Sequence, residues 1–568
     1  MKRFSLLVMV LLVFTVGLGA LHAQDSRPEI VIGLNNVPDD LCVTCDGTFP
    51  RRIIYNVFDP LVGRDFGEDG QGSTPIPGLA ESWEWISPTE LDLTIRQGVK
   101  FHNGEAMTAE DVAFTLSEEK LWGEKALTPD ALAIGLFSDV EVVDENTVRI
   151  TTAFPDGALI SRLQSQIGRV VPKAYFLEVG ADGFNQAPIG TGPYRIDGYQ
   201  PRDEVRLVAF DDYWGGMPPV ASIIYRDVPE LSTRIAGLLN NEFDLIVGVT
   251  PQQVPTLEER GFEVSVMPQE NIQMFAFMTG PDGLPVYDAR IRRALIHASD
   301  LDTISQTLFG GLVTPLIDLN SPAYGAYYDP ERPRPAYDPD LSRQLLEEAG
   351  YQGEGIKLQF IANDFVLINE TALLLQNMWS QVGLKVQLDI VPDWTLLTLR
   401  PPTDVNMWST SNNISMPDPS TPLCTIWTAD SFYASQSRIT VNPTIESLCQ
   451  QLEQTSDAEE RLALWNDLQD EWNADPQALF LWQRPEIYAY RSDLDWQPCR
   501  TSASRSILTF FRLVRNPFDR RRGAASAPAS QLRSRQRENL QTHPDIRSAP
   551  QPDAGLHLRQ LGGSARLH

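Results

Sequence analysis

Apolar and polar residues alternate over several short stretches of the chain, and this period of two predicts half-buried strands. In residues 91–96, Leu, Leu and Ile alternate with Asp, Thr and Arg. Similar strand patterns cover residues 29–34, 140–151 with a turn at 144–146, 205–210, 243–247, 356–361 and 385–390. The chain therefore contains many short strands distributed over its whole length.

Other stretches repeat their apolar residues every three to four positions, as expected of helices that bury one face. These stretches are residues 108–116, 232–240, 288–297, 341–349 and about 370–381. Thr108 and Asp111 resemble a capping box at the start of the first helix, and Gly350 ends the fourth. Strands and helices alternate, with a β-α-β-like unit at 356–390, so the pattern predicts an α/β fold.

The N-terminus has the pattern of a secretory signal peptide. Lys2 and Arg3 precede an apolar run over residues 4–18, and small residues lead to Ala23. The run is short for a membrane span, so we expect cleavage near Ala23 and export to the periplasm. A retained anchor is the alternative. No Cys follows the run, so no lipid anchor is indicated.

Charge is distributed unevenly. The whole chain carries a formal net charge of −29, yet residues 500–568 hold thirteen Arg against four acidic residues. Residues 24–499 are therefore strongly acidic and would repel phosphate backbones, so nucleic acid is not an expected partner. The tail is either disordered or the frameshifted end of the gene.

Five Cys are present, and export makes disulfides chemically possible. Cys424 and Cys449 are the candidate pair. Cys42 and Cys45 form a C-x-x-C that is either a local bridge or two thiols, and Cys499 is left over. No Cys/His cluster indicates a metal site, so none is expected.

Chemistry-bearing motifs are few in this sequence. The strings of a nucleophile elbow, a zinc protease and a phosphate-binding loop are absent. Gly190 and Gly192 lie in a proline-flanked segment that suits a rigid turn, not a dinucleotide fingerprint. His102 and His297 are interpreted as turn and helix residues. The sequence therefore predicts neither an enzyme nor a cofactor.

Residues 77–116 resemble the signature of family 5 extracellular solute-binding proteins, the dipeptide- and oligopeptide-binding receptors of bacterial ABC importers. The segment reads Pro-Gly-Leu-Ala-Glu-Ser-Trp-Glu-Trp, a strand, Gly-Val-Lys-Phe-His-Asn-Gly and a capped helix. Further strings similar to family landmarks occur in family order at residues 187–194, 212–216, 291–295, 337–339 and 345–351. The resemblance covers roughly residues 28–497.

This resemblance implies a two-lobed α/β periplasmic-binding-protein fold of type II, with hinge closure and an extra third domain. The implied parts are a signal peptide at 1–23, a first lobe at 24–49 plus 185–265 plus 480–499, an extra domain at 50–184, a second lobe at 266–479 and the tail at 500–568. The implied function is capture of a peptide or peptide-like solute by a monomer, followed by delivery to an ABC permease in the inner membrane. The alternative is a non-peptide ligand: an oligosaccharide, an opine-like compound or a metal chelate.

In peptide-binding family members a Trp and a nearby Asp hold the amino terminus of the ligand. Trp408 and Asp418 resemble this pattern, but the near Asp is absent and Ser411 stands at its spacing. Neighbouring Asn412 and Asn413 offer uncharged donors and acceptors, which suit amides, hydroxyls or sugars. Asn35 and Asn36, at the end of the first strand, are the candidates from the first lobe. The alternative is that Trp408 packs in the core beside a surface turn.

Overall fold

The computed structural model describes residues 27–41, 48–65, 74–128, 130, 133–280, 283–394, 396–397, 404–413, 418–496 and 512–513. Contacts group Met1–Leu513 as one unit and Val514–His568 as a second. The predicted signal peptide, Cys42, Cys45, Cys499 and nearly all of the tail lie outside the described residues. Among the described helices, none has both the length and the apolar character needed to cross a membrane.

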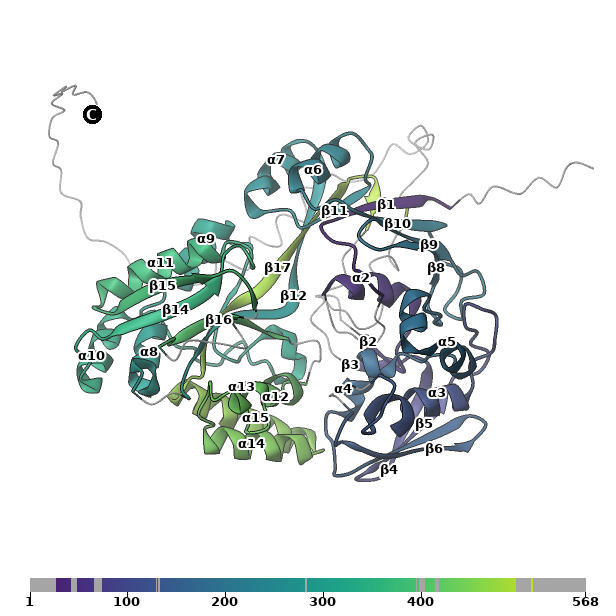
Figure 1. The fold of residues 1–568 in the computed structure, drawn as a ribbon, viewed down its shortest axis with the longest axis horizontal. Coiled ribbons are helices and arrows are strands. Elements are labelled where there is room, and N and C mark those ends of the chain that lie inside the picture. Colours follow the sequence, from purple (N-terminus) through teal and green to yellow (C-terminus); the bar gives the residue numbers. More distant parts are fainter. Residues whose placement is uncertain are drawn as a thin grey trace, which may run out of the picture. The chain divides into compact units, whose positions relative to one another are not determined.

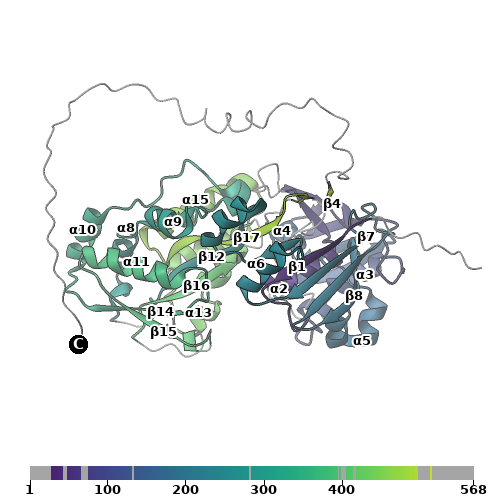
Figure 2. The same ribbon diagram turned by 90° about the horizontal axis from the view of Figure 1, so that it is seen from above.

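A mixed sheet of eleven strands forms the centre of the first unit (Figures 1 and 2). Its middle strands are β12 (Phe262–Phe277) and β17 (Ala478–Arg491), which pair antiparallel. On one side follow β11 (Leu245–Val247), β1 (Glu29–Leu34), β10 (Ser222–Asp227), β9 (Glu204–Ala209) and β8 (Tyr194–Gln200). On the other side follow β16 (Met407–Asn413), β14 (Gly355–Ile361) and β15 (Lys385–Val391), while β13 (Pro315–Ile317) pairs with β17.

Several hydrophobic cores lie on this sheet. The core at β1, β9, β10 and β11 includes α2 (Thr48–Val57) and α5 (Lys173–Gln186), and α6 (Leu231–Leu239) and α7 (Val254–Glu259) form a small core beside it. The core at β14 and β15 includes α8 (Ala289–His297), α9 (Leu301–Phe309), α10 (Pro339–Ala349) and α11 (Ile368–Gln381). A further core holds α12 (Ser420–Trp427), α14 (Pro443–Gln454) and α15 (Ala458–Ala474), with α13 (Phe432–Ser435) beside it. Met274 and Phe275 of β12 point into different cores, as expected of a strand buried on both faces.

A separate four-stranded sheet contains the segment with the family signature. Its strands are β4 (Ala80–Ser87), β5 (Glu90–Ile95), β7 (Thr147–Thr152) and β6 (Phe137–Asp144), in that order. It has its own core, together with α3 (Ala109–Thr115) and α4 (Leu159–Leu163), and β2 (Val62–Asp65) pairs with β3 (Thr74–Pro77) nearby. The Asp111 carboxylate accepts a hydrogen bond from the Thr108 N–H at 2.9 Å, so the predicted cap at α3 is confirmed.

Most predicted elements agree with the observed ones, but the long central strands extend beyond the predicted divisions. The expected boundaries of the second lobe, at 266 and 479, fall inside β12 and β17. Ile53 and Ile54 of α2 are buried in the same core as β1, although the resemblance implies an extra domain over residues 50–184. The three-part division remains a proposal. At the other end, β18 (Leu494–Asp495) pairs with β19 (Arg512–Leu513).

Candidate functional site

A cavity of 210 Å³ lies where β12 and β17 lose their regular pairing. Pro268 stands opposite Pro485, and the next pair is Ile272 with Gln483, so residues 269–271 face Arg484 alone. Proline has no N–H to donate to the ladder, and extra residues in one strand form a bulge that redirects side chains. The prolines and the bulge together open the sheet at this point.

The ends of two parallel strands form a second wall of the cavity. β1 and β11 pair in parallel, so Asn35 after β1 and residues 248–250 after β11 meet at the same edge of the sheet. Ligands of open α/β sheets bind outside this carboxyl edge. Buried Arg234 braces the loop by donating from Nε to the Val247 carbonyl at 3.0 Å and from Nη1 to Pro229 at 2.7 Å.

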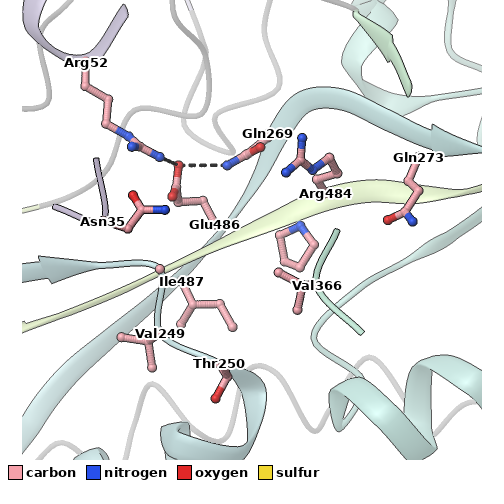
Figure 3. A pocket seen from close by; sticks show the side chains of 12 residues that line it. Asn35, Arg52, Val249, Thr250, Gln269, Gln273, Val366, Arg484, Glu486 and Ile487 are labelled. Atoms are coloured by element: carbon pink, nitrogen blue, oxygen red, sulfur yellow. Dashed lines mark hydrogen bonds and ion pairs between the residues drawn. The ribbon is translucent and has the colours of Figure 1, made fainter. Parts of the chain in front are cut away.

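An ion pair connects α2 to β17 in the wall of the cavity. Arg52 of α2 pairs with Glu486 of β17, and both side chains are more than nine-tenths buried. Gln269 also donates from Nε2 to Oε2 of Glu486, at 2.9 Å (Figure 3). The carboxylate therefore takes its partners from the protein itself, and the charges of Arg52 and Glu486 offset each other.

Arg484 differs from its neighbours on β17. Among the described residues it forms no salt bridge, whereas Glu486 and Arg491 on the same strand do. Its guanidinium carbon lies 4.6 Å from the ring centroid of Phe365, a cation–π distance. Partial burial lowers the pKa of the guanidinium, but an Arg side chain stays charged in proteins. The cavity therefore contains a cation that no carboxylate neutralises directly.

Three amide side chains at the cavity carry polar atoms without a partner among the described residues. These atoms are Asn35 Oδ1, Gln269 Oε1 and Gln273 Nε2. Leaving such a group buried and unpaired costs about 1–3 kcal/mol. All three side chains line the same cavity, so it is bordered by amides with unused hydrogen-bonding capacity.

The cavity includes only one of the side chains predicted to bind a ligand. Asn35 lines it, whereas Asn36 is exposed and does not. Trp408 is 1% exposed, lies in the core of α12, α14 and α15, and stacks edge-on against Tyr433. Asn412 is fully buried, with both amide atoms unpaired among the described residues. As ligand contacts, Asn36, Trp408 and Asn412 remain predictions.

The remaining predicted contacts lie elsewhere or outside the described side chains. The side chain of Asn413 is not described. Asp418 forms a buried salt bridge with Arg461 and accepts from the Tyr327 hydroxyl at 3.1 Å. Its other oxygen accepts from the Ser420 N–H at 3.0 Å. Asp418 is thus fully paired within the protein and does not line the cavity.

Sequence reasoning missed Arg484, Gln269 and Gln273. A usable signal was present, because Pro268 and Pro485 interrupt stretches that otherwise form long strands, and proline inside a strand marks an irregularity. Ser411, which stands at the spacing of the family's near Asp, pairs directly with Gln273. That position therefore lies next to the cavity, and it carries a hydroxyl instead of a carboxylate.

The two glycines of the predicted rigid turn are required by close packing. A Cβ on Gly190 would lie 2.1 Å from the Val57 carbonyl oxygen, and one on Gly192 would lie 2.6 Å from that of Asn56. His102 joins this turn: its Nε2 lies 2.9 Å from the Gly192 carbonyl, and its Nδ1 accepts from the Gly190 N–H at 3.3 Å. His102 and the glycines therefore have structural roles.

Cys424 and Cys449 form a disulfide that links α12 to α14, with Cα atoms 5.6 Å apart. Within the described ranges, no group of three His, Cys, Asp or Glu side chains is arranged to hold a metal ion.

Comparisons with known proteins identify the family. The profile described as bacterial extracellular solute-binding proteins, family 5 Middle, matches residues 74–434. The dipeptide-binding protein of Escherichia coli K12 is 26% identical over 350 residues, covering 56% of this chain and 64% of that protein. Heme-binding protein A of Haemophilus influenzae is 30% identical over 379 residues, which cover 60% of this chain and 67% of that protein.

A solved structure shows the same fold. The dipeptide-binding protein of Pseudoalteromonas sp. SM9913, in complex with Met-Leu, superposes with a TM-score of 0.70 at 21% identity and covers 86% of this chain and 100% of that one. This similarity confirms the predicted periplasmic-binding-protein fold. Together with the profile match over more than half of the sequence, it confirms the resemblance noted in the sequence. The chain belongs to the bacterial extracellular solute-binding proteins of family 5.

Proposed function

We propose that this protein is the solute-binding component of an ABC importer, which captures a peptide or peptide-like solute outside the cytoplasmic membrane and delivers it to a permease. Family membership supports this proposal. The observation that carries it is the cavity at the crossing of β12 and β17, lined by polar groups that lack partners among the described residues.

Hinge closure is the proposed means of capture. Asn35 and Arg52 line the cavity from the side of β1 and α2, while Val366 lines it from the loop before α11. A ligand that contacts both sides stabilises the closed arrangement over an open one, so binding shifts the population toward closure. β12 and β17 connect the two sides and carry the irregularity at residues 268–272, which is a suitable place for a hinge.

A second contact supports the same proposal. Gly157, before α4, lies so close to the end of α14 that a Cβ there would be 2.2 Å from the Thr455 carbonyl oxygen. Its N–H points to the Glu453 carbonyl oxygen at 3.4 Å. This contact joins the sheet of β4–β7 to the helices near Trp408, and we expect it to form only on closure.

Ligand size favours a short solute. The cavity has a volume of 210 Å³. Clefts for drug-sized ligands enclose about 300–1,000 Å³. A dipeptide-sized molecule therefore suits this cavity better than a haem-sized one. An opine-like compound remains the alternative, because it is also small and rich in amide-like and acidic groups.

The family relatives are binding proteins, and we propose that this chain likewise does not catalyse. Export through the N-terminal segment, a monomeric state and partnership with an inner-membrane permease belong to the same proposal.

Native mass spectrometry of the purified chain, followed by a thermal-shift screen of short peptides and oligosaccharides, tests this function. We expect a co-purified small molecule or a rise in melting temperature of several degrees, and a smaller radius of gyration in solution scattering when the ligand is bound. Absence of any ligand in both experiments, with an unchanged radius, would contradict the proposal. Turnover of the stabilising compound would indicate an enzyme.

A further inference from the structure

We infer that the cavity selects small ligands that carry a carboxylate and no free ammonium group, and that Arg484 is the residue that recognises the carboxylate. This inference rests on the proposed function and narrows the class of solute. N-acylated amino acids and N-blocked dipeptides are the simplest molecules with this chemistry.

The charges of the side chains that line the cavity favour an anionic ligand. The charged side chains at the cavity are Arg52, Arg484 and Glu486. Arg52 and Glu486 pair with each other, which leaves the positive charge of Arg484 uncompensated by direct contact. Asp364 interacts with Arg484 only beyond salt-bridge distance, and burial raises the pKa of this carboxyl. The complement of the cavity is therefore an anion.

The same balance disfavours an ammonium group. A buried ammonium needs a carboxylate and hydrogen bonds to replace its water. Glu486 is the lining carboxylate, and it is already bonded to Arg52 and Gln269. An ammonium would have to break that pair and would also be repelled by Arg484. The carboxylate of a zwitterionic peptide would thus favour binding in this cavity, whereas its ammonium group would oppose it.

Geometry favours a carboxylate as the anion. The guanidinium carbon of Arg484 lies 4.6 Å from the Phe365 ring centroid, and the planar N–H fork of an Arg side chain matches a planar acceptor with two oxygens. The strand pair opens at this residue, because three residues of β12 face it alone. Gln273 on β12 lines the same cavity, and its Nε2 donor has no partner among the described residues.

The other unpaired atoms indicate what else the ligand presents. Asn35 Oδ1 and Gln269 Oε1 are acceptors that lack a donor among the described residues. Rotation of either amide toward the cavity would let an amide N–H or a hydroxyl of the ligand donate to its oxygen, whereas a purely apolar tail would leave both unpaired. A carboxylate joined to one or two amide groups therefore suits the side chains that line the cavity.

Three related probes separate the contributions of the two charged groups: N-acetyl-dialanine, which is an anion; dialanine, which is a zwitterion; and N-acetyl-dialanine amide, which is neutral. Titration calorimetry on the full purified chain measures each affinity. We expect N-acetyl-dialanine to bind at least about 10-fold more tightly than dialanine and about 30-fold more tightly than the amide, as one charge-assisted contact allows.

Variants assign the preference to one side chain. Arg484→Gln should abolish the preference for the anion over the amide, and Arg484→Lys should restore part of it. Arg491→Gln is the matched control, because Arg491 lies on the same strand but pairs with Asp244 and Asp493 outside the cavity. It should leave all three affinities unchanged. Circular dichroism melts show whether each variant is folded.

Equal binding of the three probes, or an anion preference that survives Arg484→Gln in a folded protein, would overturn this inference and leave the proposed function intact. If the probes fail, native mass spectrometry decides: a co-purified ligand with a carboxylate and no ammonium supports the inference, and any other ligand overturns it. Absence of every ligand would overturn the proposed function and this inference together.

Discussion

Two buried polar regions of this protein have opposite hydrogen-bonding states. Around Asp418, the carboxylate bonds to Arg461, Tyr327 and Ser420, so its needs are met within the chain. At the cavity, Arg484 has no salt bridge and Gln273 has an unpaired donor among the described residues. A satisfied network supports the fold, whereas an unsatisfied one beside a cavity is prepared for a ligand.

The difference shows why a residue pattern alone misassigns roles. Asp418 resembles a family landmark, and the structure engages its carboxylate with other residues of the chain. Arg484 resembles no landmark, and it becomes notable only because its neighbours leave it without a counter-charge. Two experiments test this contrast, and a third tests His102, a further buried group whose hydrogen bonds are made within the chain.

The largest effect is expected from breaking the Asp418 network. Arg461→Met would leave the Asp418 carboxylate buried without its cation, which costs about 3–5 kcal/mol of unfolding free energy. Arg484→Met at the cavity should change it by less than about 1 kcal/mol, because no salt bridge is lost. Urea unfolding of both variants measures the two values. Equal losses would mean that Arg484 is also structural.

The pH dependence of the unfolding free energy tests whether His102, in the segment with the family signature, has a structural role. Burial lowers the pKa of His102 to about 4, below its ordinary value of 6.5. The unfolded chain therefore takes up the proton first as the pH falls. The stability that the neutral ring contributes is complete above pH 6.5 and declines toward pH 4, with a loss of about 2 kcal/mol at pH 5.

Unfolding free energies of the wild type and His102→Gln between pH 7.5 and 4.5 measure this contribution. Their difference should shrink as the pH falls. A constant difference would show that His102 does not titrate with folding, and ligand affinity should be unaffected by the variant at neutral pH.

The smallest effect is a gain in stability. Gln273→Met removes a buried unpaired donor at the cavity and should raise the stability of the ligand-free protein by about 1 kcal/mol while weakening ligand binding. Gln477→Met is the control. Buried Gln477 donates to the Asp475 carbonyl at 2.8 Å, so this variant should be less stable than the wild type by about 1 kcal/mol. Thermal melts compare them. A loss at both positions would remove the contrast between the two regions.

Much of the fold was predictable because local patterns dominate it. The predicted helix that ends at Gly350 and the strand around residues 91–96 are confirmed, since periodicity, caps and turns act over a few residues. The long strands β12 and β17 were not predicted as continuous. Proline interrupts each strand, and most of β17 and the second half of β12 are buried on both faces, so the alternation of a half-buried strand covers only residues 262–266 of β12.

The candidate site was predicted only in part, through Asn35. The end of a first parallel strand is a recognisable place in an α/β sequence, and the structure places Asn35 at the cavity. Arg484 and Gln273 are separated by more than two hundred residues in the chain. Pro268 and Pro485 mark an irregularity in each strand, but no local pattern indicates that the two irregularities pair and bring Arg484 and Gln273 to one opening.

The sequence by itself determined the family, the α/β class and most of the secondary structure, because these depend on local periodicity and on strings of adjacent residues. Only the tertiary structure decided which buried polar groups are satisfied. Whether Asp418 or Arg484 has a partner depends on strands and helices far apart in the chain, and that pairing separates a structural ion pair from a candidate ligand contact.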